Sequence, residues 1–304
     1  MKKDSIIMNK VAVLMSTYNG GSYVEEQIKS IYEQTQDGVK LYIRDDGSDP
    51  VFINQLKILQ EKYPFVLYLG ENVGFLKSFW WLLEHVEDAQ YYSFADQDDI
   101  WYATKLEHAV VWLENQRMKN VPLLYHCAYL VKNEETDETS MFYYAEDGYD
   151  FRRSITENHY SGFAMVINRM MRDEMLKGDV TQIDYHDWWA ANIAKAFGNA
   201  YNDKTVGAIH RAHQKNVTKI TFKSRLQWLK RMLTEETDIK KRMKEFDRAF
   251  VDSISGQNKR WVERFATPRY SFLNAVFKTF YPKRFRPVMS SEIVLRILML
   301  IGRV

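Results

Sequence analysis

The chain has 304 residues, enough for one large α/β domain with an appendage or for two modest domains. Hydrophobic residues make up 46% of the chain and charged residues 27%, a balance that supports a packed core and excludes a wholly disordered protein. The formal net charge is only +2, which argues against a dedicated nucleic-acid-binding protein, so we expect no nucleic-acid partner.

Strands and helices are predicted to alternate along the first 131 residues. Short apolar runs bounded by turn residues predict buried strands at 11–15, 39–43, 65–69, 91–94 and 123–131. The segments between them predict helices that begin near residues 22, 50, 74 and 104. Strands that recur at intervals of roughly 25 residues are typical of a doubly wound, mostly parallel α/β sheet.

In sheets of this kind, ligands bind beyond the carboxyl ends of the strands. Three of the predicted strands end in polar sequences, at 16–21, 44–48 and 95–99. We therefore expect these three strand ends to form one site.

The pattern changes after residue 131. Residues 141–159 are irregular and rich in Tyr and charge, and 161–167 form a largely apolar segment that leads into a helix. Residues 184–196 predict a further helix and 200–210 a final strand. The remainder of the chain is predicted to be helical and basic.

The sequence Asp96-Gln97-Asp98-Asp99 places three carboxylates within four residues, directly after a predicted strand. Such groups repel one another, and a divalent cation would relieve the repulsion. Oxygen ligands beside phosphate oxygens suit Mg²⁺ or Mn²⁺. The alternative is a solvated acidic loop or a charge cluster at a helix N-terminus.

The other two strand ends carry weaker signals. In residues 44–48 an Asp at the strand end can accept hydrogen bonds from a nucleobase or ribose, although an Asp-Gly turn alone would explain the pattern. Residues 16–21 offer hydroxyl groups, an aromatic face and a flexible backbone, and a plain turn is the alternative. Neither the glycine spacing of a dinucleotide-binding loop nor a Walker lysine is found there.

Two later segments combine titratable and aromatic side chains. In His186-Asp187-Trp188-Trp189, an Asp beside aromatic rings can have a raised pKa, which suits a general base, and the tryptophans could form a platform for a sugar ring. The alternative is a core Trp pair with an Asp helix cap. In residues 210–216 a His could add a nitrogen ligand to a carboxylate-bound metal, and Arg and Lys could neutralise phosphates, although a structural His is the alternative.

As an ordered set, these segments resemble the family 2 glycosyltransferases of GT-A fold, especially the bacterial rhamnosyltransferase-like group. The resemblance covers residues 10–220. The motifs that carry it are Ser16-Thr17-Tyr18-Asn19-Gly20, Arg44-Asp45-Asp46-Gly47-Ser48, Glu71-Asn72-Val73-Gly74-Phe75, Phe94-Ala95-Asp96-Gln97-Asp98-Asp99-Ile100-Trp101, Ser161-Gly162-Phe163, His186-Asp187-Trp188-Trp189 and Arg211-Ala212-His213-Gln214-Lys215-Asn216.

The resemblance implies a domain organisation and a set of site residues. A GT-A catalytic domain with a Rossmann-like, mostly parallel sheet and flanking helices would span 1–220, with nucleotide binding in 10–131 and the acceptor side in 132–220, followed by a helical, basic C-terminal extension at 221–304. The residues implied to bind the donor nucleotide are Thr17, Tyr18, Asn19, Asp45, Asp46, Asn72, Gly74, Lys77, Asp96 and Gln97. Those implied to hold Mn²⁺ or Mg²⁺ are Asp98, His213 and Asp96.

Asp187 matches the catalytic base of the family, and the acceptor side is implied to include Gly162, Trp188 and Trp189. One departure is His186, because many family members have Glu-Asp where this chain has His-Asp. The Gln-x-x-Arg-Trp pattern of processive synthases is absent, which favours single or limited sugar transfer.

The implied activity is that of an inverting, metal-dependent hexosyltransferase. Its donor would be dTDP-β-L-rhamnose and its acceptor a lipid-linked saccharide, in the biosynthesis of a cell-surface polysaccharide such as a capsule or cell-wall polymer. Three alternatives stay open: transfer of galactose, glucose or an N-acetylhexosamine from a UDP-sugar; synthesis of an activated sugar; and a non-catalytic glycan-binding scaffold. A synthesising enzyme would usually carry a glycine-rich N-terminal loop with a basic residue, which this chain lacks.

The C-terminal region mixes aromatic and basic residues at 277–286, followed by a short apolar helix at 293–301. This combination predicts a segment that lies on an anionic membrane surface, and a helix packed on the catalytic domain or on a partner subunit is the alternative. No run reaches the ~20 apolar residues of a spanning helix. The lone Cys127 suits a reducing compartment. We therefore expect a cytoplasmic protein, peripheral on the inner face of the cell membrane.

Overall fold

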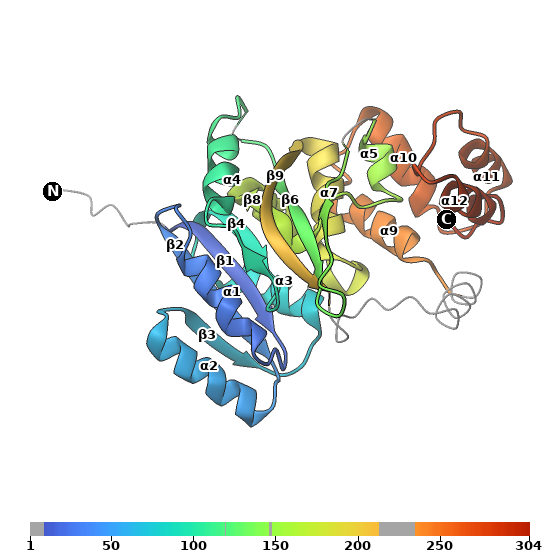
Figure 1. Ribbon diagram of the computed structural model, residues 1–304. Coiled ribbons are helices and arrows are strands. Elements are labelled where there is room, and N and C mark those ends of the chain that lie inside the picture. Colours follow the sequence, from blue (N-terminus) through green and yellow to red (C-terminus); the bar gives the residue numbers. More distant parts are fainter. Residues whose placement is uncertain (1–8, 119, 146–147, 213–234) are drawn as a thin grey trace.

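The computed structural model describes residues 9–118, 120–145, 148–212 and 235–304, and these form a sheet with helices on both faces (Figure 1). Within this described part the sheet has nine strands, in the order β3-β2-β1-β4-β8-β6-β9-β5, and β7 pairs with β6. The strands are β1 Asn9–Thr17, β2 Val39–Asp46, β3 Val66–Gly70, β4 Ala89–Ala95, β5 Ile100–Trp101, β6 Leu123–Asn133, β7 Thr139–Phe142, β8 Met165–Asn168 and β9 Asn199–Ala212.

The helices lie between and after these strands. They are α1 Tyr23–Tyr32, α2 Pro50–Lys62, α3 Phe75–His85, α4 Lys105–Glu114, α5 Phe151–Ser154, α6 Arg169–Met175, α7 His186–Phe197, α9 Asp238–Phe250, α10 Gly256–Ala266, α11 Phe272–Thr279 and α12 Met289–Leu300, with short 3-10 turns η1 Gly162–Ala164 and η2 Val180–Gln182. The predicted strands and helices through residue 131 are confirmed in order, and the two-residue strand β5 was not predicted. At α2 the Asp49 carboxylate accepts the amide of Phe52, so the predicted start at Asp49-Pro50 is also correct.

Parallel pairing brings the polar strand ends to one edge of the sheet. The five residues Val11–Met15 of β1 are all inaccessible to solvent, which explains why this strand is apolar without alternation. The register pairs Thr17 with Asp45 of β2 and Met15 with Ala95 of β4. The loops that follow β1, β2 and β4 therefore start side by side, as the sequence predicts.

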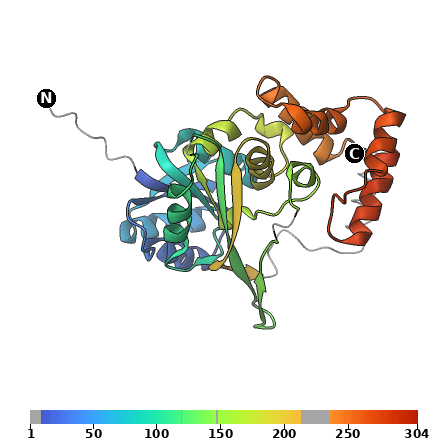
Figure 2. The same ribbon diagram turned by 90° about the horizontal axis from the view of Figure 1, so that it is seen from above.

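Beyond β4 the sheet becomes mixed. The apolar segment expected at 161–167 contributes β8, which runs antiparallel to both β4 and β6. The long strand β9 then pairs in parallel with β6, and its last residues pair with β5. This pairing returns the chain to the loop at 95–99. The β6–β7 hairpin projects from the end of the sheet (Figure 2).

The C-terminal helices extend the core on the side of α7. The ring of Phe246 in α9 lies 5.4 Å from that of Trp189 and 5.9 Å from that of Phe197. Arg242, which is also in α9, is fully buried and forms an ion pair with Asp184. Helices α9 to α12 are grouped at the end of the molecule opposite β3 (Figure 1). Among the helices of the described ranges, none is long and apolar enough to cross a membrane.

Candidate active site

The loops after β1 and β4 are joined by one side chain. The Gln97 amide donates to the backbone oxygen of Tyr18 at 3.1 Å, and its oxygen accepts the Tyr18 N–H at 2.9 Å. Gly20 packs against the same amide, because a Cβ atom added there would lie 2.5 Å from Gln97 Oε1. The acidic loop and the loop at 16–21 are therefore held against each other, and the Tyr18 side chain remains half exposed beside them.

The buried carboxylate of Asp45 holds the loop after β2. It accepts hydrogen bonds from Thr17 Oγ1 at 3.2 Å, from the Ser48 amide at 2.9 Å and from Ser48 Oγ at 2.6 Å. The amide of Asn19 donates to Ser48 Oγ at 2.9 Å, and its side-chain oxygen accepts the amide of Asp49. The predicted nucleotide residues Thr17, Asn19 and Asp45 thus lie together in one hydrogen-bonded cluster.

Asp46 fixes the segment that precedes α3. Its carboxylate accepts hydrogen bonds from the amides of Val73 at 3.0 Å and Gly74 at 2.8 Å, and it pairs with the buried guanidinium of Arg44 at 2.5 Å.

The turn after β2 requires a glycine. Gly47 has a φ of 80°, and a Cβ atom there would lie 2.7 Å from the Asn72 amide nitrogen, so both the backbone conformation and the available space require glycine. The side chains of Asn72 and Lys77 are exposed beyond this loop.

The acidic loop contacts the end of β9. Asp99 is fully buried, and its Oδ1 atom lies 2.8 Å from Nδ1 of His210. The next residue, Arg211, donates from Nε to the backbone oxygen of Asp98 at 2.6 Å. The sequence predicts a metal-binding His within residues 210–216 and the resemblance assigns it to His213; His210 itself is paired with Asp99, the third carboxylate of the loop.

The donor set at this loop fits a hard divalent cation. Burial, together with the charges of Asp99 and Asp98, raises the pKa of Asp96 to about 8, which is the repulsion that a cation would relieve. The Oδ2 atom of Asp99 is buried and has no hydrogen-bond partner. Asp96 and Asp98 supply the carboxylate oxygens that Mg²⁺ and Mn²⁺ prefer. Among the residues the structure describes, no group of three or more His, Cys, Asp or Glu side chains surrounds one point, and the expected ligand His213 lies outside them.

Asp187 stands in the first turn of α7, directly after His186, whose ring packs against Phe94 of β4. Its Oδ1 atom accepts the amide of Trp188 at 2.7 Å. Burial raises the pKa of Asp187 to about 7, against the opposing effect of hydrogen bonds from the Trp188 and Gly162 amides and the Asn158 side chain. The negative charge of Asp187 also contributes to the raised pKa of Asp96, so the two carboxylates interact electrostatically.

His186 lies beneath the Gly162 loop as a neutral side chain. A Cβ atom at Gly162 would lie 2.5 Å from its Nε2 atom, so the loop passes directly over the imidazole. The ring is buried between Phe79 and Phe94, with centroids 4.8 and 4.6 Å away, and neither ring nitrogen has a hydrogen-bond partner. Burial lowers the pKa of His186 to about 3, so this position adds no charge beside Asp187.

The two tryptophans after Asp187 have different environments. Trp189 is fully buried, and its indole N–H donates to the backbone oxygen of Met175 at 3.1 Å. The expectation that Trp189 offers a platform for a sugar ring is therefore wrong, because α9 covers it. Trp188 keeps partial exposure while its Nε1 donates to the Ser154 oxygen at 2.6 Å and Arg242 lies over its ring.

A buried lysine near the site was missed by sequence reasoning. Lys105 begins α4, and its Nζ donates to the backbone oxygen of Phe163 at 2.6 Å and lies 3.1 Å from the Trp101 ring centroid. Burial lowers the pKa of Lys105 to about 7. Phe163 in turn stacks on His210 with centroids 5.0 Å apart. The position of Lys105 after the acidic loop was the only available signal, since a lysine at a helix start is ordinarily exposed.

Comparison with known proteins identifies the family of the chain. The chain belongs to glycosyl transferase family 2, whose model matches residues 12–178. It is 29% identical over 231 residues to the dTDP-rhamnosyl transferase RfbG of Shigella flexneri, a match that covers 71% of this chain and 78% of the relative. Membership of the family supports a hexosyltransferase activity.

Solved structures show the same fold at low sequence identity. TarS of S. aureus, residues 1–349 in complex with UDP-GlcNAc, matches with a TM-score of 0.59 and 13% identity, over 90% of this chain and 76% of that one. The mannosyltransferase PcManGT of Pyrobaculum calidifontis, in complex with GDP-Man and Mn²⁺, matches with a TM-score of 0.54 and 16% identity, over 97% and 87%. The predicted GT-A architecture with a helical C-terminal extension is thus confirmed.

Proposed function

We propose that this glycosyltransferase transfers L-rhamnose from dTDP-β-L-rhamnose, with inversion, to a lipid-linked saccharide in the biosynthesis of a cell-surface polysaccharide. The observation that supports the proposal is the packing of His186, the residue before Asp187, against Phe94 of β4, two residues before Asp96, at the edge of the sheet where the loops after β1, β2 and β4 meet. The similarity to RfbG supports rhamnose as the sugar and a dTDP-sugar as the donor.

Asp187 is the catalytic base in this proposal. Its carboxylate takes the proton of an acceptor hydroxyl while that oxygen forms a bond to the anomeric carbon, and the bond from that carbon to the nucleotide diphosphate breaks on the opposite face. One such displacement inverts the configuration, so a β-L-rhamnosyl donor gives an α-L-rhamnoside. Partial desolvation suits Asp187 to this role, because it raises the carboxylate's affinity for a proton.

The loops around the acidic sequence position the donor. Asp96 and Asp98, with His213 as the third expected ligand, would hold Mn²⁺ or Mg²⁺, which when bound supplies positive charge for the leaving diphosphate. Thr17, Asn19 and Asp45 would orient the base and ribose through the cluster that already joins them. The exposed side chains of Asn72 and Lys77 would border the nucleotide.

A screen of nucleotide sugars tests the proposal and its alternatives. The protein is heated with dTDP-β-L-rhamnose, UDP-glucose, UDP-galactose, UDP-GlcNAc or no sugar, each with and without Mn²⁺, because a ligand that binds only the folded state raises the melting temperature. We expect the largest rise with dTDP-rhamnose and metal, together with slow release of dTDP. A rise with a UDP-sugar instead would assign another hexose, and binding without any turnover would indicate a glycan-binding scaffold.

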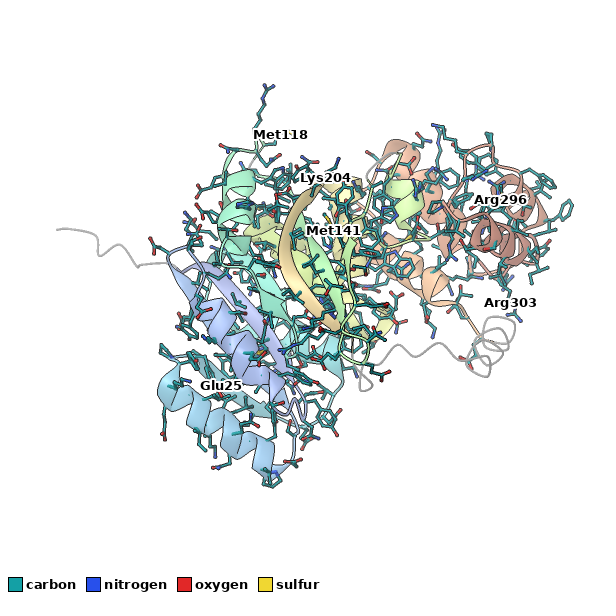
Figure 3. The ribbon with its side chains drawn as sticks, viewed as in Figure 1. Glu25, Met118, Met141, Lys204, Arg296 and Arg303 are labelled. Carbon is teal, nitrogen blue, oxygen red and sulfur yellow. The ribbon has the colours of Figure 1, made fainter. Side chains whose placement is uncertain are left out.

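A membrane-facing role of the C-terminal helices is part of the same proposal. Helices α11 and α12 each bury one face and expose another that is apolar; we term the exposed side chains the C-terminal apolar face, consisting of Phe272, Leu273, Phe277, Phe280, Ile293, Val294, Ile297, Leu300 and Ile301. Between residues 264 and 304 every charged side chain except Glu292 is basic. Glu292 is buried and bound to Arg296, so anionic lipid headgroups complement the charge of this region (Figure 3).

Vesicle sedimentation tests this surface. We expect binding to vesicles that contain phosphatidylglycerol and little binding to pure phosphatidylcholine. Leu273→Asp with Ile297→Asp should release the protein, whereas Val51→Asp, at an equally exposed position of α2, should not. If the double variant instead converts a dimer into a monomer and vesicle binding is absent throughout, the face is an interface between two copies of the chain.

A further inference from the structure

Five aromatic rings form a continuous row from β6 to the segment before η1. We term this row the aromatic strip: Tyr129, Phe142, Tyr144, His159 and Tyr149. Successive ring centroids along it are 5.1, 4.7, 5.1 and 3.8 Å apart. All but the Phe142–Tyr144 contact are stacked, and that one is edge-on. Rings at these separations attract one another beyond simple burial, so the row is a preorganised surface.

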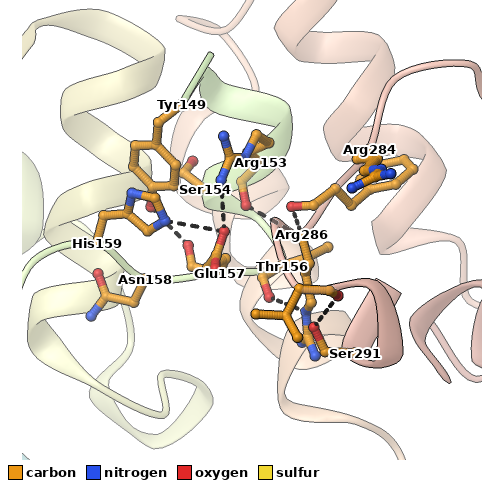
Figure 4. A network of polar contacts seen from close by, with 12 residues as sticks. Tyr149, Arg153, Ser154, Thr156, Glu157, Asn158, His159, Arg284, Arg286 and Ser291 are labelled. Carbon is orange, nitrogen blue, oxygen red and sulfur yellow. Dashed lines mark hydrogen bonds and ion pairs between the residues drawn. The ribbon is translucent and has the colours of Figure 1, made fainter. Parts of the chain in front are cut away.

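The inner end of the aromatic strip is firmly anchored (Figure 4). The Tyr149 hydroxyl donates to the Glu157 backbone oxygen at 2.7 Å, and the Glu157 carboxylate lies 3.1 Å from His159 Nε2 and 3.0 Å from Arg153 Nη2. Arg286 from the C-terminal region donates to the backbone oxygen of Thr156. The other end of the row, at Tyr129 and Phe142, is held by the β6–β7 ladder, in which these two residues pair directly.

The aromatic strip passes beside the proposed catalytic base. The Tyr129 hydroxyl lies 3.2 Å from Ser161 Oγ. The residue after Ser161 is Gly162, which packs on the imidazole of His186, the neighbour of Asp187. Burial, together with the charge of Asp187, raises the pKa of Tyr144.

Only two rings of the aromatic strip are accessible to a ligand. Phe142 is 38% exposed and Tyr144 is partly exposed, whereas Tyr129, His159 and Tyr149 are buried behind them. The available surface thus combines two apolar ring faces with the hydroxyls of Tyr144 and Ser161. A pyranose ring has the matching character, because it has C–H groups on one face and hydroxyl groups around its rim.

We propose that Phe142 and Tyr144 form the acceptor subsite, where they bind one pyranose of the acceptor saccharide by its C–H face and direct a hydroxyl of that sugar toward Asp187. This inference rests on the proposed function and adds the position of the acceptor. It replaces the platform expected at Trp189. The sugar is held by ring faces from β7 and the residues directly after it rather than from α7, so the sequence of this segment selects the acceptor.

Saturation-transfer NMR with simple glycosides tests the subsite. The probes are methyl α-L-rhamnopyranoside, methyl β-D-glucopyranoside and methyl N-acetyl-β-D-glucosaminide, with the full-length protein. We expect at least one to receive saturation at its C–H protons, and Phe142→Ala and Tyr144→Ala to weaken its binding by about 2- to 10-fold each. Tyr144→Phe keeps the ring and should retain most of the binding.

Met141→Ala is the matched control, because Met141 is 55% exposed and neighbours Phe142 in β7, so alternation along the strand directs the two side chains to opposite faces. Nucleotide-sugar binding, followed by thermal shift, should be equal in all the variants, which also shows that they fold. Equal glycoside binding in Phe142→Ala, Tyr144→Ala and the wild type would overturn the subsite, as would no binding of any probe to the wild type. If the wild type itself shows no binding of any nucleotide sugar, the proposed function is refuted instead.

Discussion

The Nδ1 atom of His210 lies 2.8 Å from Oδ1 of Asp99, across 111 residues of sequence. Burial alone would lower the pKa of His210, but the hydrogen bond to Asp99 and the charges of Asp99, Asp96 and Asp98 together outweigh burial, so this pKa is raised. The pair therefore joins the end of β9 to the acidic loop by a charge-assisted hydrogen bond.

A double-mutant cycle on this pair should show strong coupling. Asp99→Ala and His210→Ala each remove one partner of the hydrogen bond and leave the other, a partly buried imidazole or a fully buried carboxylate, without it, so each should lower the free energy of unfolding by about 1–3 kcal/mol. The double variant should lose less than the sum, by roughly 0.5–3 kcal/mol. Urea denaturation measures all four proteins, and strictly additive losses would show that the contact contributes nothing.

Replacement of the proposed base should separate turnover from donor binding. Asp187→Asn cannot accept a proton, so we expect transfer to fall by roughly 10²- to 10⁴-fold. The thermal shift produced by nucleotide sugar and metal should persist, because the loops that hold the donor are intact. Asp173→Asn, which alters a partly exposed carboxylate on α6, is the control. Near-normal turnover by Asp187→Asn would remove this residue from the role.

The rate of transfer should depend on pH through the same carboxylate. Burial raises the pKa of Asp187 to about 7, and the group must be deprotonated to act as a base. The sign is therefore a rising rate with rising pH: kcat/KM should increase about tenfold per pH unit well below pH 7 and level off above it. The residual activity of Asp187→Asn should lack this rise of kcat/KM below pH 7. A flat wild-type profile below pH 7 would contradict the assignment of Asp187 as the base.

The buried Arg44–Asp46 pair should be critical for both stability and nucleotide binding. Arg44→Met leaves the Asp46 carboxylate buried without its cation, which typically costs about 3–5 kcal/mol. Because Asp46 also holds the amides of Val73 and Gly74, the segment before α3 should loosen and donor affinity should fall. Urea denaturation and thermal shift measure the two effects. Lys40→Met, which removes an exposed ion pair with Glu87, should cost less than about 1 kcal/mol.

Mild acid should destabilise the fold through two buried histidines. Burial lowers the pKa of His126 and of His186 to about 3, below the ordinary value of 6.5. Since each pKa is depressed in the folded state, the stabilising contribution is complete above pH 6.5 and is lost as pH falls toward 3, by up to about 1.4 kcal/mol per pH unit for each group. The raised pKa values of Asp96 and Asp187 act in the opposite direction over the same pH range, so the wild type is compared with His186→Phe. Urea midpoints at neutral and mildly acidic pH should fall less in the variant, and an equal change in both proteins would show that His186 is not held neutral.

The strands and helices of the first 131 residues could be predicted from the sequence, because a buried strand and the turn that follows it depend on residues that are adjacent in the chain. The apolar run at Val11–Met15 and the polar residues after it predict both the strand and its place at the site edge. The Asp99–His210 pair could not be predicted, since it depends on β9 lying between β6 and β5. Trp188 and Trp189 are equivalent in sequence, and only the position of α9 decides which of them is buried.

The paired hydrogen bonds between Gln97 and the Tyr18 backbone should couple the binding of two ligands. A segment that would contact the nucleobase and a segment that would contact the cation are fastened together, so displacement of one transmits strain to the other. Occupancy at either end should therefore stiffen both, and the affinity for metal and the affinity for nucleotide should rise together by the same factor.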